Sequence, residues 1–336
     1  MLFVASCEHR PLVEPEQMTD SRYVRVYLDE EIRNVSYGFY NDNLPKPYYR
    51  TPEMMRVVLF DEATAGMSSE AYLRDRGRDE RGYFLEGYIT AKPGNYRLLA
   101  YNFDTESVHI GNEYNYHIMY AYTNPISDEL YGRLGSVRNA PDKDTWKIVY
   151  EPDHFFIESG KIVEVEEKTD TLRPADHSCF LATTSVKSYY LQVEVTGAEL
   201  VTSAVALLSG MAGSVQINDR QMLTDDPVAV HFELNKDKDQ KRSEKTLAYA
   251  TFTTFGKLEE QENYLSITFE FYTKNGKTYT ETIPLTELFQ TEQVKVNQWI
   301  LIDKVITIDE NIEDDSGEGM TPNVGEWENT EGEIYI

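Results

Sequence analysis

The chain has 336 residues, 58 acidic and 32 basic side chains, and a formal net charge of −26 at pH 7. That charge excludes a protein that binds nucleic acid, since phosphates are bound by clustered Lys and Arg, and it disfavours adhesion to anionic lipid through a basic face. The length suggests about two domains, each able to bury a core without disulfides.

The first seven residues end in a pattern typical of an export signal. Short side chains in Val4-Ala5-Ser6 come directly before Cys7, as a signal peptidase requires. The run resembles a bacterial lipobox, whose Cys becomes the mature N-terminus and carries acyl chains such as palmitate. We therefore expect residues 1–6 to be the rest of a signal peptide, Cys7 to be lipidated, and residues 7–20 to form a tether. No stretch is apolar over the roughly 20 residues that cross a bilayer, so the lipid is the expected membrane attachment.

The first half of the chain then reads as a series of strands. Strict alternation of apolar and polar residues predicts half-buried strands over residues 23–29 and 161–166, and residues 56–60 predict a more buried one. Residues 83–102 predict a hairpin, because Pro93-Gly94 supplies the backbone angles of a type II turn.

Two short helices are expected among these strands, over residues 68–76 and 127–134. Residues 167–178 are polar and aperiodic, and we place a domain boundary there. The expected N-terminal β-sandwich is therefore residues 21–170, and the C-terminal one is residues 179–336.

The second half restarts with alternating or apolar strands over residues 189–195, 204–208 and 228–234. Asn275-Gly276 lies between two alternating runs, which predicts a hairpin with a type I′ turn. One helical turn over 284–289 and one or two strands over 294–308 complete the expected elements. Many short strands and few helices indicate an all-β protein, and the 24 Tyr fit half-buried strands.

No group of residues has the spacing of a catalytic or metal site. His177 and Cys179 lie close together in the sequence, but a catalytic Cys needs a His brought from elsewhere in a cleft. Zinc spacings such as HExxH or CxxC, phosphate-binding loops and nucleophile elbows are absent from the sequence. We expect no catalytic residues, no metal, no cofactor and no enzymatic activity.

Aromatic residues gather around residues 112–122, where sugars could stack if the rings were exposed. Tyr114, Tyr116 and Tyr120 are the candidate glycan platform, with Tyr114 and Tyr116 expected on one strand face. The competing interpretation is packing within a half-buried sheet, which is the commoner fate of such residues.

Several segments together resemble the fimbrillin-like, minor-fimbrium-anchor lipoproteins of Bacteroidales. The resemblance spans nearly the whole chain and rests on the order of residues 7–12, 93–102, 152–156, 188–197, 206–214 and 322–327. It implies two tandem transthyretin-like, Greek-key β-sandwiches with a few short helices. Arg10 and Arg22 are candidate sites for the N-terminal trimming seen in polymerising members, but a cut after either would discard the lipid.

The resemblance also implies a role. The chain would be a lipid-anchored, surface-exposed subunit of the cell outer membrane that anchors or initiates a fimbria. Its expected partners are fimbrial (pilin) subunits, joined by β-strand addition, and the outer membrane, joined through the lipid on Cys7. The alternative is a surface lipoprotein that binds glycans through its Tyr-rich strands.

Overall fold

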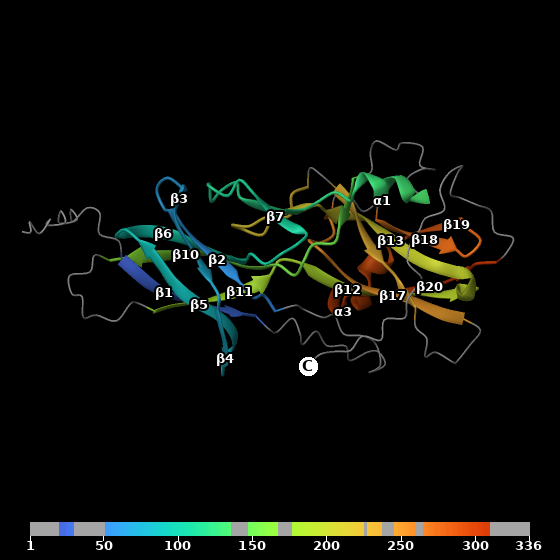
Figure 1. The fold of residues 1–336 in the computed structure, drawn as a ribbon, viewed down its shortest axis with the longest axis horizontal. Coiled ribbons are helices and arrows are strands. Elements are labelled where there is room, and N and C mark those ends of the chain that lie inside the picture. Colours follow the sequence, from blue (N-terminus) through green and yellow to red (C-terminus); the bar gives the residue numbers. More distant parts are fainter. Residues whose placement is uncertain are drawn as a thin grey trace, which may run out of the picture.

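The computed structural model describes residues 20–29, 51–135, 147–166, 177–224, 227–236, 245–259 and 265–309. These residues form strands of four sheets with a few short helices, so the expected all-β fold is confirmed. Two strand-rich bodies follow one another along the long axis of the molecule (Figure 1).

The first body is an eight-stranded sheet that folds over on itself. Its order is β3 (Met67–Leu73), β2 (Met55–Asp61), β6 (Gly94–Asn102), β10 (Phe156–Val165), β11 (His177–Thr184), β1 (Asp20–Leu28), β5 (Gly82–Ala91) and β4 (Asp75–Asp79). The fold closes where the Ser69 hydroxyl of β3 donates a hydrogen bond to the Thr90 carbonyl of β5. Alternating apolar residues of both layers, such as Val24, Val26 and Leu98, form the core between them.

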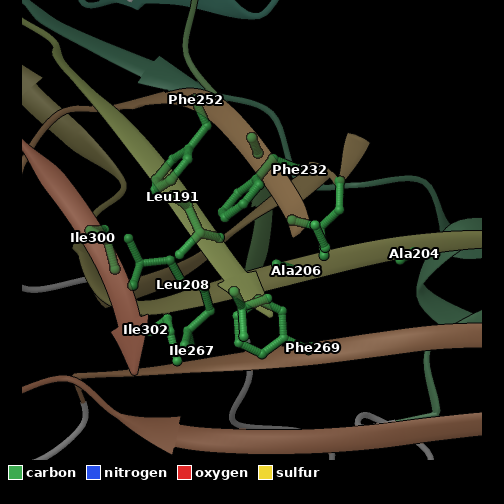
Figure 2. Packing of buried hydrophobic residues seen from close by; sticks show 14 of the residues in the cluster. Leu191, Ala204, Ala206, Leu208, Phe232, Phe252, Ile267, Phe269, Ile300 and Ile302 are labelled. Carbon is green, nitrogen blue, oxygen red and sulfur yellow. The ribbon is translucent and has the colours of Figure 1, made fainter. Parts of the chain in front are cut away.

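The second body is a sandwich of a four-stranded and a five-stranded sheet. The first contains β16 (Asn235–Lys236), β17 (Lys245–Thr254), β12 (Lys187–Thr196) and β20 (Trp299–Thr307), in that order. The second contains β19 (Thr278–Pro284), β18 (Ser266–Thr273), β13 (Val201–Ala212), β15 (Pro227–Glu233) and β9 (Ile148–Tyr150). Figure 2 shows their side chains meeting between the sheets, where Phe232 and Phe252 stack with ring centroids 3.9 Å apart.

Pairing across the middle of the sequence joins the two bodies. In a three-stranded sheet, β14 (Ser214–Gln216) pairs with β8 (Tyr120–Thr123), which pairs with β7 (Val108–Gly111). Strand β9 belongs to the first half of the chain but pairs in parallel with β15. One core cluster takes residues from both halves, including Phe60, Tyr101 and Phe255. The second half therefore cannot be removed without exposing core surface on the first.

The position of β11 bears on the expected boundary. Residues 167–176 lie outside the described part of the chain. Strand β11 pairs in parallel with β1 and antiparallel with β10, so residues 179–184, expected in the second domain, belong to the first sheet. The boundary was placed too early because the residues before this strand are polar and aperiodic. We propose that the chain has two domains and that the second begins after Thr184.

The strands expected over residues 83–102 are present, but they do not form a hairpin. Strand β5 pairs with β1 and β4, whereas β6 pairs with β10 and β2. The turn between them carries the chain from one layer of the sandwich to the other. Local turn chemistry predicts a reversal of direction but not whether the two strands share a sheet.

The helix expected over residues 68–76 is wrong. Residues 67–73 alternate between the two faces of β3, whose pairing with β2 replaces a helix, and residues 75–79 form β4. The second expected helix is confirmed as α1 (Asp128–Arg133), whose first turn is capped by the Ser127 hydroxyl accepting from the Leu130 N–H at 3.2 Å.

Near the C-terminal end, the expected helical turn is confirmed as the 3₁₀ helix η6 (Leu288–Gln290). Helix α3 (Glu292–Asn297) follows it and occupies part of the range expected to be strand, so β20 starts only at Trp299. A further 3₁₀ helix, η4 (Ala198–Leu200), joins β12 to β13.

The hairpin around Asn275-Gly276 is confirmed, since β18 and β19 pair antiparallel on either side of it. The type I′ turn is wrong, because Gly276 has a positive φ of 82° and Asn275 does not. The Gly276 N–H bonds to the Thr273 carbonyl at 3.0 Å, which closes a turn whose last residue is left-handed.

Replacing Gly276 with Val is therefore expected to destabilise the protein. A bulky residue held at φ 82° costs about 1–3 kcal/mol. The measurement is the urea midpoint of unfolding, with Asn275→Ala as a control that leaves the left-handed position untouched. An unchanged midpoint for Gly276→Val would show that the turn has another conformation.

Candidate strand-pairing interface

Sheet edges are where a partner strand can be added, and most edges of this protein are blocked. Edge strand β4 spans five residues, four of them charged, and β3 closes against β5. The edge strands β16 and β9 span only two and three residues. Short or charged edges offer little to a partner's backbone.

Edge strands β14 and β7 span three and four residues, and β19, the edge of the five-stranded sheet opposite β9, spans seven. Strand β20 is the longest edge strand in the described part of the chain. It spans nine residues and pairs in parallel with β12 on one side. Among the described residues, no strand pairs with the other side along residues 300–307. Its core-facing residues, Ile300, Ile302 and Ile306, hold it against the second sandwich.

The hydrogen bonds show which backbone groups face outward. The Tyr190 N–H of β12 donates to the Gln298 carbonyl at 2.9 Å, and the Ile308 N–H donates to the Thr196 carbonyl at 2.8 Å. Because bonding residues alternate along a strand, the N–H groups of Leu301, Val305 and Thr307 point away from β12. They are the groups that a partner strand would meet.

A bulge interrupts this edge. The register between β20 and β12 shifts between Val193 and Glu194, which leaves Asp303 and Lys304 as extra, exposed residues. The Lys304 ammonium bonds to the Glu281 carboxylate of β19, and this bond lowers the pKa of that carboxyl. A charged bulge opposes pairing with an arbitrary strand. It therefore favours a partner strand whose backbone and charges are complementary to the bulge.

The N-terminal strand β1, unlike β20, is central in its sheet. It forms eight residue pairs with β5 and six with β11. Outside the core, the Arg25 guanidinium bonds to the Glu86 carboxylate at 2.6 Å and lies 3.9 Å from the centre of the Phe84 ring. The expected cut site Arg22 lies inside this strand, so a protease would reach it only after β1 left the sheet.

The structure separates the three tyrosines expected to form a glycan platform. Tyr114 is 73 % exposed, but Tyr116 is only 5 % exposed and packs edge-on against Phe60 with ring centroids 5.6 Å apart. Tyr120 is half-buried on β8 and packs beside Tyr122 at 5.6 Å.

Residues 112–118 form bends and turns apart from an isolated bridge between Asn115 and Gly66, so Tyr114 and Tyr116 do not share a strand face. A shared exposed platform of these rings is therefore wrong. Alternation in a short polar-aromatic run had suggested a strand, whereas buried Arg56 holds this segment as turns through its ion pair with Glu113 at 2.5 Å.

The two cysteines, a metal site and a membrane span are the last points to compare with the structure. Cys7 lies outside the described residues. Cys179 is a free, exposed thiol on β11, rather than in a linker. Within the described ranges, no group of three or more His, Cys, Asp or Glu could hold a metal ion. No helix in that part of the chain is long and apolar enough to cross a membrane.

Sequence reasoning missed the β20 edge. The sequence showed strand character over residues 294–308, but only the sheet order shows which strand lies at an edge. The one available signal was the charged pair Asp303-Lys304 inside an apolar run, which is typical of a guarded edge.

Comparison with known proteins adds a family and a relative. A family model described as domain of unknown function DUF5119 matches residues 42–233. A curated protein of Bacteroides ovatus, named as a fimbrium anchoring subunit, Fim4B, is 26 % identical over 210 residues, which cover 62 % of this chain and 53 % of that protein. The match thus spans about half the length of the relative. The resemblance to fimbrium-anchoring proteins indicated by the sequence motifs is confirmed.

A solved structure shares the fold. A protein of Bacteroides ovatus named as an adhesin is 20 % identical with a TM-score of 0.57, and the match covers 93 % of this chain and 99 % of that one. The fimbrial anchor protein Mfa2 of Porphyromonas gingivalis is 16 % identical with a TM-score of 0.45, over 88 % of this chain and 94 % of that one.

Proposed function

Because this chain belongs to the DUF5119 family and has a relative named as a fimbrium anchoring subunit, we propose that it anchors or initiates a fimbria at the cell outer membrane. It is held there by a lipid on Cys7 and is exposed at the cell surface. A fimbrial subunit is its partner, and its role is structural rather than enzymatic.

The partner is joined by β-strand addition, and the unpaired edge of β20 is the observation that carries this part of the proposal. On the side away from β12, residues 300–307 have no described strand beside them, while their buried isoleucine side chains fix them in the core. Main-chain bonds to Leu301, Val305 and Thr307 would supply affinity, and the Asp303-Lys304 bulge would set the register.

Strand β1 supports the anchoring role, because it is where a lipid tether enters the fold. A pull between the membrane and the fibre reaches β1 first through the residues that follow Cys7. The strand is paired on both sides and its core face is buried, so the load acts on many hydrogen bonds at once. A subunit that must stay attached under tension needs such a central first strand.

Lipidation is tested by replacing Cys7 with Ala. The variant should leave the membrane fraction and lose label from a radioactive fatty acid, because no other acyl site is proposed. Cys179→Ala is the matched control, since it removes the free thiol on β11 and should leave both readouts unchanged. A Cys7→Ala protein that stays membrane-bound and labelled would contradict the proposal.

The anchoring role is tested by counting cell-attached fimbriae in a strain without the gene. We expect fibres to be shed into the medium or to fail to form, and the same result in the strain restored with Cys7→Ala. Restoration with Cys179→Ala should return attached fibres to normal. Normal numbers and lengths of attached fibres in both the deletion and the Cys7→Ala strains would contradict anchoring.

A further inference from the structure

A second feature lies away from the β20 edge, on the outer face of the second sandwich. There a cavity of about 520 Å³ opens between the five-stranded sheet and helix α1. The sheet contributes Tyr150, His231, Glu233 and Tyr272, and the helix contributes Leu130 and Arg133. A cavity of this size suits a small ligand, because ligand sites in proteins typically measure about 300–1,000 Å³.

His231 is the unusual group in this cavity. It lies in the middle of β15, is only 7 % exposed, and its Nε2 atom has no hydrogen-bond partner. Burial lowers the pKa of His231 to about 4, so the imidazole is neutral at neutral pH. A buried polar atom without a partner is costly, and a hydroxyl group of a ligand would satisfy it.

Tyr150 supplies an aromatic face beside this histidine. The two residues are register partners on neighbouring strands, and their rings are perpendicular with centroids 6.5 Å apart. Tyr150 is 37 % exposed, and its hydroxyl accepts a hydrogen bond from the Ser127 N–H at 3.4 Å, which ties the ring to the start of α1. A partly exposed ring fixed at its far end offers a flat apolar surface for stacking.

The polar rim favours a neutral ligand. Two carboxyl groups, Glu151 and Glu233, and the Asn235 amide line the cavity. Burial raises the pKa of Glu151 to about 7, so that near neutral pH its carboxyl can both donate and accept hydrogen bonds. Arg133 is already paired with Glu129 on its own helix. Anionic ligands are disfavoured by the carboxyl groups, and no group of three or more His, Cys, Asp or Glu among the described residues could hold a metal ion.

We propose that this cavity binds a neutral saccharide unit, whose ring stacks on Tyr150 and whose hydroxyl groups bond to His231 Nε2 and to the carboxyl and amide groups of the rim. A sugar ring has an apolar face and a polar edge, which match the aromatic wall and the polar rim. The proposal does not depend on fimbrial anchoring, and it moves the glycan site from the Tyr114 region to the outer face of the second sandwich.

The test is saturation-transfer NMR on the full chain with four probes: methyl α-D-mannoside, methyl β-D-galactoside, N-acetylglucosamine and L-fucose. We expect at least one probe to give a signal that Tyr150→Ala weakens at least tenfold and Tyr150→Phe preserves, since Phe retains the stacking face. His231→Phe should also abolish the signal, because it fills the cavity and removes the acceptor.

Tyr114→Ala is the matched control, because this highly exposed ring lies outside the cavity and its loss should change nothing. Variants are compared after their unfolding midpoints have been measured, and His231→Leu replaces His231→Phe if that variant does not fold. No signal from any of the four probes would overturn the proposal. Equal binding by wild-type protein, Tyr150→Ala and the His231 variant would overturn it as well.

Discussion

Replacing Val26 with Asp is expected to unfold the first sandwich. Val26 is fully buried in the middle of β1, between Leu85 of β5 and Phe180 of β11. An unpaired carboxylate there has no partner in the apolar core, and leaving such a charge buried costs about 3–5 kcal/mol. Whole domains are stable by only about 5–15 kcal/mol, so the loss is a large fraction of the total.

The measurement is urea unfolding followed by circular dichroism. Val26→Thr is the matched control, because it nearly keeps the shape of Val and adds a hydroxyl without a charge. It should cost about 1–3 kcal/mol. A Val26→Asp protein with an unchanged midpoint would mean that β1 does not belong to the core and cannot carry the load from the proposed membrane tether.

Replacing Gly197 with Ala is the second change with a large expected effect. Gly197 has a φ of 79°, and a Cβ atom at this position would lie 1.8 Å from the Ile308 carbonyl oxygen. The left-handed conformation costs a non-glycine residue about 1–3 kcal/mol, and the clash adds about 1–3 kcal/mol more as the backbone at the end of β20 moves away. We expect a total of about 2–6 kcal/mol.

Gly132→Ala is the control for that experiment. Gly132 lies in helix α1, and a Cβ atom there would meet nothing within 4 Å. The change should stabilise the helix slightly, by about 0.5–1 kcal/mol. Equal midpoints for Gly197→Ala and wild-type protein would contradict the close contact between the ends of β12 and β20.

Alternation was enough to predict several of the strands. Residues 23–29 and 189–195 put one apolar face into a core, and the structure contains strands at both places. The prediction was wrong over residues 68–76. A short run of Ser, Glu, Ala and Leu suits a helix, but pairing with β2 makes residues 67–73 a strand. Pairing between strands decided the outcome, and pairing is not local in the sequence.

Sheet membership and edges were beyond the sequence for the same reason. The turn at Pro93-Gly94 was placed correctly, yet β5 and β6 lie in opposite layers. Tyr116 was expected beside Tyr114, but tertiary contact with Phe60 buries it. The sequence did not single out His231 either. A single His in an alternating strand does not indicate the cavity that forms between this strand and helix α1.

We expect a fimbrial partner to pair with the outer edge of β20. The most direct test of this pairing is the affinity of edge variants for fimbriae sheared from the same strain. Leu301→Pro removes an N–H that points away from β12, so the internal ladder should survive and the partner should be lost. Leu301→Thr keeps that N–H and serves as control, and Val305→Pro repeats the test beyond the bulge.

We predict that both Pro variants keep the wild-type circular dichroism spectrum and lose at least tenfold in affinity, while Leu301→Thr binds as the wild type does. Folded Pro variants that bind fimbriae with unchanged affinity would contradict strand addition at β20.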